Sequence, residues 1–403
     1  MELASRTIGL EESVTLAISQ QVKKLKSEGK DIIDFTVGEP YYQPPKNVED
    51  AIKKALKEGK TGYTAAQGTV ELRDAVCRKY EQENMIYKPS QILISNGAKS
   101  AISNILLTLI EQGDEVLIPP PYWTSYPQMV KAVEGIPIII EMDEKFKLNP
   151  KSIFEKKTDK TKLLILNSPN NPTGAILDYA TLKEIARWAV KEDILVLYDE
   201  IYEKFIYDRK KHVSLASLED EVSGIKERAI TINGISKSYG KLTGLRIGWA
   251  AGNEEIIKTA SNLQSQLSGC PPSLSQYAAL EALTGPQGFV DKWKAELEAR
   301  RDLVYDYLSK LDRTKIFFGF SDPDGANFSK PEGAFYFFID IRRVTSDSGK
   351  FAEKLLEYGN VAVLPGSAFG REGFVRLGYS CSFEDIREGC ERIDNAIGKI
   401  VMF

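Results

Sequence analysis

Apolar residues between about positions 92 and 252 repeat one pattern: a short β-rich run, a loop, and a segment with helical spacing. One helical segment carries apolar residues at positions 102, 105, 106, 109 and 110, the spacing of a half-buried helix. Another carries them at positions 182, 185, 186, 189 and 190. This alternation predicts an α/β architecture in which helices flank a mostly parallel central sheet.

Three of the apolar runs are followed by polar residues that are able to do chemistry. The runs are "LLILN" from Leu163, "ILVLY" from Ile194 and "AITIN" from Ala229. Because crossover connections make such strands parallel, the loops that follow them gather at one edge of the sheet. We expect the functional crevice at this edge.

The two ends of the chain are less repetitive than its middle. Residues 1–45 end in the turn-forming "GEPYYQPP", and the last third alternates helical segments with the strands "GAFYFFIDI" and "FVRLGYS". A chain of 403 residues is also long enough for more than one core. We predict a large domain over residues 46–290 and a smaller α+β domain formed by residues 1–45 and 291–403.

Composition and charge favour chemistry on small molecules. The formal net charge is −4 with both signs interspersed, so the chain has no basic surface for nucleic acid or an anionic membrane. No apolar run approaches the length of a membrane span, and the start of the chain lacks the layout of a signal peptide. We therefore expect a cytoplasmic enzyme with small-molecule partners, without nucleic acid or membrane.

Histidine and cysteine usage excludes several reaction classes. The single histidine, His212, lies in a polar stretch and is predicted to be in an exposed loop. The four cysteines show no C-x-x-C spacing, so we expect neither disulfides nor a metal site. Serine hydrolases and histidine-ligated metal enzymes need imidazole groups that this chain does not supply.

The predicted crevice collects Asn171, Asp199, Ser236 and Lys237. Taken singly, each has an ordinary explanation as a turn, a cap or a surface residue. Taken together, they supply what pyridoxal phosphate (PLP) requires: an amine for a Schiff base, an anion for the ring nitrogen and a donor for the ring hydroxyl. A carboxylate beside the ring nitrogen favours the protonated ring, which then accepts electrons.

A phosphate cradle is predicted in "SNGAKS", where Asn96 and Gly97 precede a helix whose free N–H groups bind anions. Arg246 would add a charged fork to this cradle. Trp123 is a candidate stacking surface for the ring, although a tryptophan flanked by prolines is as often plain packing.

Nearly the whole chain resembles the class I aminotransferases of PLP fold type I, and in particular their bacterial and archaeal aspartate aminotransferase-like branch. The matching stretches, in chain order, are "VGEP", "GYTAAQGTVELR", "SNGAKSAI", "PPYWTSYP", "NSPNNPTG", "YDEIYE", "ISKSYGKLTGLRIGW", "PEGAFY", "VAVLPGSAFG" and "FVRLGYS". The resemblance implies a PLP enzyme that exchanges an amino group between an L-amino acid and a 2-keto acid. It also implies a homodimer with shared active sites.

The resemblance assigns roles to individual residues. Lys237 would form the Schiff base and move the proton, and Asp199 would face the ring nitrogen. The remaining expected cofactor contacts are Asn171 and Tyr202 at the ring hydroxyl, Ala98, Lys99, Ser236 and Arg246 around the phosphate, Trp123 on the ring, and Tyr63 from the second subunit. The expected substrate contacts are Gly38, Trp123, Asn171, Arg376 at the α-carboxylate, and Lys99, which favours aspartate or glutamate as donor.

Three departures from the branch concern the pocket. One extra residue stands between Lys237 and Arg246, near Lys241; "GEPYYQPP" replaces the common "GEPDF-x-TP"; and Gly378 replaces a serine. Substrate preference is therefore left open between dicarboxylic amino acids on the one hand and aromatic amino acids or prephenate on the other.

Other functions on this sequence have less support. PLP lyases and synthases share the fold, and fold alone does not separate them from aminotransferases. A PLP-binding regulator would need a nucleic-acid-binding segment for which no length is left. The glycines near Lys241 do not have the spacing of a phosphate-binding nucleotide loop, and no G-x-G-x-x-G opens a helix for a dehydrogenase.

Overall fold

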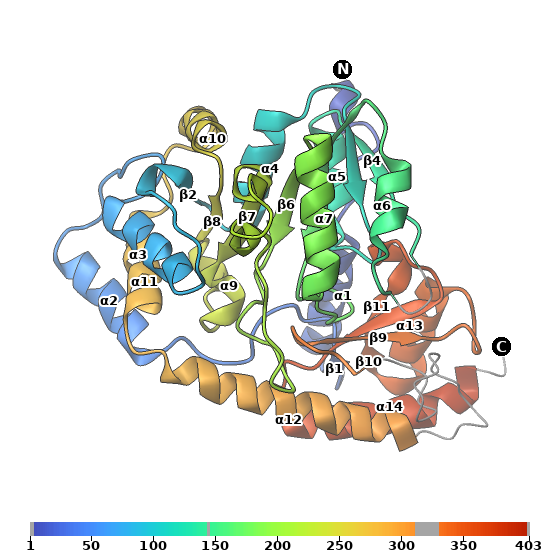
Figure 1. Cartoon of the computed structure of the whole chain (residues 1–403). Helices are drawn as coiled ribbons and strands as arrows, with labels where there is room; N and C mark the ends of the chain where they lie inside the picture. The colour runs from blue at the N-terminus through green and yellow to red at the C-terminus, as the bar shows by residue number, and fades with distance from the viewer. Residues whose placement is uncertain (1–3, 143–145, 311–329, 401–403) are drawn as a thin grey trace.

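The computed structural model describes residues 4–142, 146–310 and 330–400. Within these ranges the largest sheet has seven strands in the order β2-β8-β7-β6-β5-β3-β4 (Figure 1). Its strands are β2 Ile92–Ser95, β3 Glu115–Ile118, β4 Ile136–Ile139, β5 Thr161–Asn167, β6 Leu195–Asp199, β7 Ala229–Gly234 and β8 Gly248–Ala251. Strands β3 to β7 pair in parallel, and β8 is antiparallel to β2 and β7. The predicted mostly parallel sheet is confirmed.

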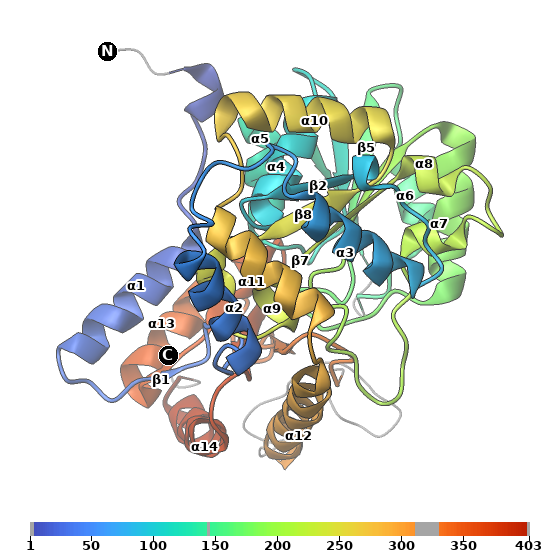
Figure 2. The same ribbon diagram turned by 90° about the vertical axis from the view of Figure 1, so that its left-hand side faces the viewer.

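Helices cover both faces of this sheet, which explains why its strands read as continuous apolar runs. Successive side chains of a strand point to opposite faces, so Leu163 and Ile165 pack on one side and Leu164 and Leu166 on the other. The first face is covered by α4 Ala98–Leu109, α5 Ser125–Ala132 and α10 Glu254–Leu267. The second is covered by α2 Lys46–Lys57, α3 Val70–Glu81, α6 Pro150–Lys156, α7 Tyr179–Glu192, α8 Ile225–Arg228 and α11 Ser273–Thr284. Figure 2 shows α4 and α5 on one side of the strands and α7 and α8 on the other.

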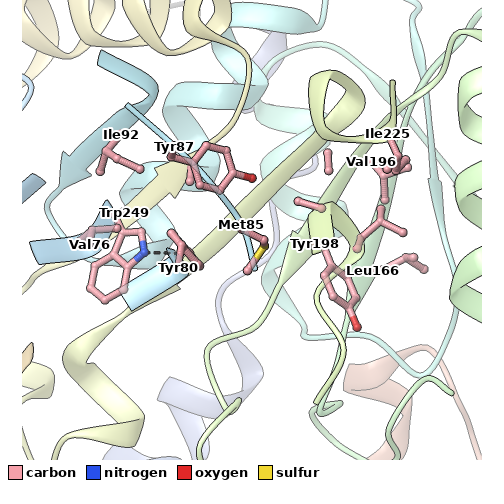
Figure 3. Packing of buried hydrophobic residues seen from close by; sticks show 14 of the residues in the cluster. Val76, Tyr80, Met85, Tyr87, Ile92, Leu166, Val196, Tyr198, Ile225 and Trp249 are labelled. Carbon is pink, nitrogen blue, oxygen red and sulfur yellow. Dashed lines mark hydrogen bonds between the residues drawn. The ribbon is translucent and has the colours of Figure 1, made fainter. Parts of the chain in front are cut away.

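The second face contains several aromatic side chains whose polar atoms have to be satisfied. In Figure 3 Trp249 of β8 lies against Tyr80 of α3, with Met85 and Tyr87 beside them. The Trp249 indole N–H donates a hydrogen bond of 3.0 Å to the Tyr80 hydroxyl. Buried Trp and Tyr retain a partner in this way, which allows large rings to fill the core.

Local signals in the sequence set the ends of the helices. The Asp178 carboxylate accepts a hydrogen bond from the Thr181 N–H at the start of α7, and Asp193 ends that helix in a left-handed conformation. Asn253 caps α10 in the same manner. Gly97, with φ +87°, makes the turn from β2 into α4, a conformation that glycine adopts without strain.

Segments from both ends of the chain pack together beside the large sheet. Strand β1 Ile33–Asp34 pairs in parallel with β10 Val361–Ala362, and a second sheet has the antiparallel order β11-β12-β9. Its strands are β9 Tyr336–Asp340, β11 Leu364–Pro365 and β12 Phe374–Gly378, and the accompanying helices are α1 Val14–Ser27, α12 Gly288–Lys310, α13 Ser348–Gly359 and α14 Phe383–Ile400. In Figure 1 the long helix α12 runs below the large sheet to this region. The division into domains at residues 45 and 290 stays a prediction.

Within the described ranges, no helix has the length and apolar character that crossing a membrane requires.

Candidate active site

The carboxyl ends of β5 and β6 meet where the sequence predicts the crevice. Asn167 and Asp199 are register partners, and the Asn167 amide donates a hydrogen bond of 2.9 Å to the Asp199 carbonyl. The Asn167 side-chain oxygen in turn accepts a hydrogen bond of 2.8 Å from the Asn171 N–H. The sheet register thus brings Asn171 beside the end of β6.

Asp199 is a buried carboxylate with an ordered set of donors. Its Oδ2 accepts a hydrogen bond of 2.6 Å from the Tyr126 hydroxyl, and its Oδ1 accepts one of 3.1 Å from the Ile201 N–H. Burial raises the pKa of Asp199 to about 6, although both of these donors and the Lys237 ammonium oppose the shift. When ionised, a buried carboxylate of this kind stabilises a cationic group placed next to its oxygens.

Lys237 extends from α9 Ile235–Ser238, the short helix after β7. Its amino group donates a hydrogen bond to the Gly38 carbonyl. Burial lowers the pKa of Lys237 to about 8, and the Arg376 and Arg246 cations also lower it, against the Glu39 and Asp199 carboxylates. The Asp199 carboxylate raises the pKa of Lys237 slightly, and the Lys237 ammonium lowers that of Asp199. The structure therefore presents a lysine that loses its proton near pH 8, well below the range of an ordinary lysine.

An anion cradle forms at the start of α4. The Arg246 guanidinium donates a hydrogen bond of 3.3 Å to the Asn96 carbonyl and packs so closely on Gly97 that a Cβ there would lie 2.4 Å from Nη2. Ser236 is buried in the short helix that carries Lys237, and the N–H of Ala98 opens α4. The extra residue near Lys241 does not prevent Arg246 from reaching this point.

Arg376 of β12 lies buried between two regions of the chain. One guanidinium nitrogen donates to the Asn171 side-chain oxygen at 3.0 Å, and the other donates to the Thr36 carbonyl at 2.8 Å. Its Nε is buried without a hydrogen-bond partner among the described residues, and its guanidinium lies 4.3 Å from the centre of the Tyr336 ring. The cation therefore retains donors, the Nε–H among them, for an anionic ligand.

Two further predicted residues border this cation. The Tyr202 hydroxyl forms a hydrogen bond of 2.8 Å with the Tyr336 hydroxyl. Gly38 borders Tyr336 and Arg376: a Cβ on it would lie in ordinary van der Waals contact, 3.4 Å from the tyrosine hydroxyl oxygen and 4.0 Å from the Arg376 Nη2. The Gly38 carbonyl accepts the hydrogen bond from the Lys237 amino group, so this glycine joins the lysine to the surroundings of Arg376.

Lys99 and Trp123 lie together at the mouth of the site. The Lys99 ammonium is 4.8 Å from the centre of the Trp123 ring, and burial together with Arg246 lowers the pKa of Lys99. Tyr63, in contrast, is fully exposed, so this chain does not bring it to its own site. Its expected contact across a dimer stays a prediction.

Three residues beside the predicted site residues were missed in the sequence: Thr36, which contacts Arg376 through its backbone carbonyl, Tyr126 and Tyr336. Tyr126 follows Trp123 by three residues at the start of α5, and this helical spacing places the two rings side by side. The spacing was a usable signal. The contacts of Thr36 and Tyr336 depend on long-range packing that no local pattern reports.

The prediction for His212 was wrong. Its side chain is only 11% exposed, stacks on the Tyr198 ring with 6.0 Å between centroids, and has its Nε2 3.4 Å from a Glu200 oxygen. Burial lowers the pKa of His212, but the Glu200, Glu203 and Glu83 carboxylates together raise it by more, so the net shift is upward. Polar neighbours in the sequence suggested exposure, but this loop folds back over buried acids.

One group of potential metal ligands is present among the described residues, formed by Glu200, Glu203 and His212. The Lys79 ammonium lies 2.8 Å from Glu203 and the Lys204 ammonium 3.8 Å from it. Two lysines therefore already supply cations at this group.

Comparison with known proteins agrees with this geometry. Residues 30–393 match the family model described as aminotransferase class I and II. A probable aspartate/prephenate aminotransferase of Aquifex aeolicus (strain VF5) is 41% identical over 99% of both chains, and an aspartate aminotransferase of Bacillus sp. (strain YM-2) is 39% identical over 98% of this chain and 99% of its own. The solved structure of an aspartate aminotransferase from Thermus thermophilus with maleate superposes with a TM-score of 0.91, at 35% identity over 98% of this chain and 100% of that one.

The chain belongs to the class I and II aminotransferase family. The predicted aminotransferase class and fold type I architecture are thereby confirmed.

Proposed function

We propose that this aminotransferase binds PLP on Lys237 and transfers an amino group between an L-amino acid, aspartate or glutamate in the first place, and a 2-keto acid such as 2-oxoglutarate. The observation that carries the proposal is the pairing of a half-buried lysine, whose pKa is lowered to about 8, with the buried Asp199 carboxylate at the carboxyl edge of the sheet. The names of the relatives, aspartate and aspartate/prephenate aminotransferases, support this choice of substrate.

The residues present fit the cofactor. Arg246 and the first turn of α4 form a cradle for a phosphate, and Gly97 leaves the space that this cradle needs. The buried Asn96 side-chain oxygen has no hydrogen-bond partner among the described residues, so an acceptor remains there for a donor group of the ligand. Asp199 would face the ring nitrogen, Asn171 and Tyr202 the ring hydroxyl, and Trp123 one face of the ring.

When bound, the protonated ring of PLP withdraws electrons from the carbon that exchanges its proton. Lys237 would move the proton: its amine is neutral often enough at physiological pH to accept the proton from the α-carbon of the amino acid and to deliver it to the cofactor carbon that carries the nitrogen. Asp199 stabilises the positive charge on the ring nitrogen because opposite charges favour each other at short range.

Substrate binding falls to Arg376 and Lys99. Arg376 has an Nε without a hydrogen-bond partner among the described residues, and this Nε lies beside Nη2, the nitrogen that contacts the Thr36 carbonyl; Nε and the second N–H of Nη2 form a suitable fork for an α-carboxylate. Lys99 stands at the mouth of the site, where its ammonium would pair with a second carboxylate. Maleate, named with the Thermus thermophilus structure, is such a dicarboxylate.

The test is the first half-reaction, followed with one amino acid at a time. Protein loaded with PLP should convert to the pyridoxamine form with aspartate or glutamate, and Lys237→Ala should fold but fail to convert. Lys99→Met tests the preferred donor, since it should slow the conversion by aspartate much more than the conversion by alanine. Conversion with aromatic donors alone would replace the dicarboxylate proposal by the aromatic or prephenate alternative.

We also propose a homodimer in which Tyr63 reaches the partner's site. A fully exposed tyrosine supports this proposal, since large aromatic residues are enriched at interfaces. Mixing inactive Lys237→Ala with inactive Tyr63→Ala tests it, because a mixed dimer holds one site with both residues intact. Recovered activity supports shared sites, and no recovery in a mixture shown to exchange subunits contradicts them.

A further inference from the structure

We propose that Tyr126 is a positioning residue, which keeps Asp199 ionised and fixed in orientation while it holds the Trp123 ring in place. This inference rests on the proposed function, because it concerns the two groups assigned to the ring of the cofactor. No sequence motif used above gives Tyr126 a role.

The contact with Asp199 is short and shielded from water. The Tyr126 hydroxyl, on a side chain only 2% exposed, donates to Asp199 Oδ2 at 2.6 Å. The Ile201 N–H donates to the other oxygen, so the carboxylate is held from two sides. A carboxylate offers about four acceptor positions, which leaves capacity for a further donor such as a ring nitrogen.

Tyr126 contacts Trp123 through its ring as well as through its backbone. The two ring centroids are 5.3 Å apart with an interplanar angle of 85°, an edge-to-face contact. The Tyr126 N–H also donates a hydrogen bond of 3.0 Å to the Trp123 carbonyl. The Tyr126 side chain therefore contacts both Asp199, which would face the nitrogen of the PLP ring, and Trp123, which would lie on one face of that ring.

The hydroxyl has a clear electrostatic effect. Burial raises the pKa of Asp199, and the Tyr126 hydrogen bond is the first of the interactions that oppose this rise. Without the hydroxyl, Asp199 holds its proton to higher pH and loses its attraction for a protonated ring nitrogen. The Tyr126 ring is embedded among apolar residues of the first sheet face, so no other donor takes its place by a small movement.

The experiment compares Tyr126→Phe with the wild-type holoenzyme and with a matched control, Tyr379→Phe. Tyr379 is also fully buried, and its hydroxyl donates to the Ala334 carbonyl at 3.2 Å in the other sheet region. Three quantities are measured for each protein: the rate of PLP loss, the pH midpoint of the absorbance of bound PLP, and kcat and KM for aspartate.

For Tyr126→Phe we expect PLP to be held roughly 10- to 150-fold more weakly, which is the loss of one hydrogen bond to a charged group. The absorbance midpoint should shift, and kcat should fall more than KM changes. Tyr379→Phe should lower only the melting temperature. Replacing Tyr126 with fluorotyrosine, a stronger donor of nearly the same shape, should shift the midpoint in the opposite direction and keeps the test valid if Tyr126→Phe does not fold.

The possible failures are distinguishable. Wild-type protein that does not take up PLP refutes the proposed function itself. Wild-type protein that takes up PLP, together with a Tyr126→Phe variant of unchanged retention and midpoint, overturns the inference alone. Equal loss of stability in both phenylalanine variants, without spectral change, shows a purely structural hydroxyl and overturns it as well.

Discussion

The ionisation of Lys237 gives the most direct physical prediction. The structure lowers its pKa from 10.5 to about 8, mainly through burial. A shift of about 2.5 pKa units corresponds to about 3.4 kcal/mol of preference for the neutral amine. At pH 7.5 about a quarter of the Lys237 side chains are neutral, against about one in a thousand for an ordinary lysine.

The perturbation is a pH titration of the protein without cofactor. Lysines are converted to their dimethyl form with carbon-13 formaldehyde, and each methyl resonance is followed by NMR as the pH rises. Lys237→Arg identifies the Lys237 resonance by its disappearance. We expect its midpoint near pH 8, well below the midpoints of the surface lysines.

The same shift affects stability, with a definite sign. Because the pKa of Lys237 is lowered in the folded state, the unfolded chain binds more protons between about pH 8 and pH 10.5. The free energy of unfolding of the wild type relative to Lys237→Met therefore rises as the pH rises across this window. Below the window it is up to about 3 kcal/mol lower than above it. A Lys237 resonance that titrates near 10.5, with no such pH dependence, would refute the reasoning.

Three other predictions concern the remaining parts of the site. Arg376→Lys should raise KM for every amino acid and lower kcat/KM by roughly 10- to 100-fold, because the fork that contacts Asn171 and a carboxylate is lost; steady-state kinetics with aspartate and alanine measure this. Gly97→Ala should weaken PLP binding, since its Cβ would lie 2.4 Å from a guanidinium nitrogen, whereas Gly113→Ala, with a similar φ and nothing within 4 Å, should leave PLP binding unchanged. Asp199→Asn should gain about 3 kcal/mol in free energy of unfolding relative to wild type as the pH rises from about 4 to about 6, because the raised pKa of Asp199 makes its ionisation destabilising in the folded protein. Chemical unfolding across this range measures the difference, and a difference in free energy of unfolding that does not change with pH would contradict the raised pKa.

The sequence could predict the large sheet because its signals are local and repeated. Runs such as Leu163 to Asn167 are apolar on both faces, and helices with a regular stripe stand between them. Parallel pairing then places Asn171, Asp199 and Lys237 at one edge by topology alone. No knowledge of side-chain contacts was needed for that step.

The parts that escaped prediction depend on contacts between distant segments. Arg376 contacts Thr36 across 340 positions of the chain, and Tyr126 reaches Asp199 across 73. His212 looked exposed because its neighbours in sequence are polar, yet its loop packs on the Tyr198 ring. Such contacts follow from tertiary packing, which composition and periodicity do not encode at single positions.

The central claim is that Lys237 carries the cofactor, and covalent trapping tests it most directly. The protein is incubated with PLP, reduced with borohydride, digested and analysed by mass spectrometry. We predict one reduced pyridoxyl adduct at stoichiometric yield on the peptide that contains Lys237, and none at that yield in Lys237→Ala. An adduct on another lysine, or equal labelling of both proteins, would contradict the account.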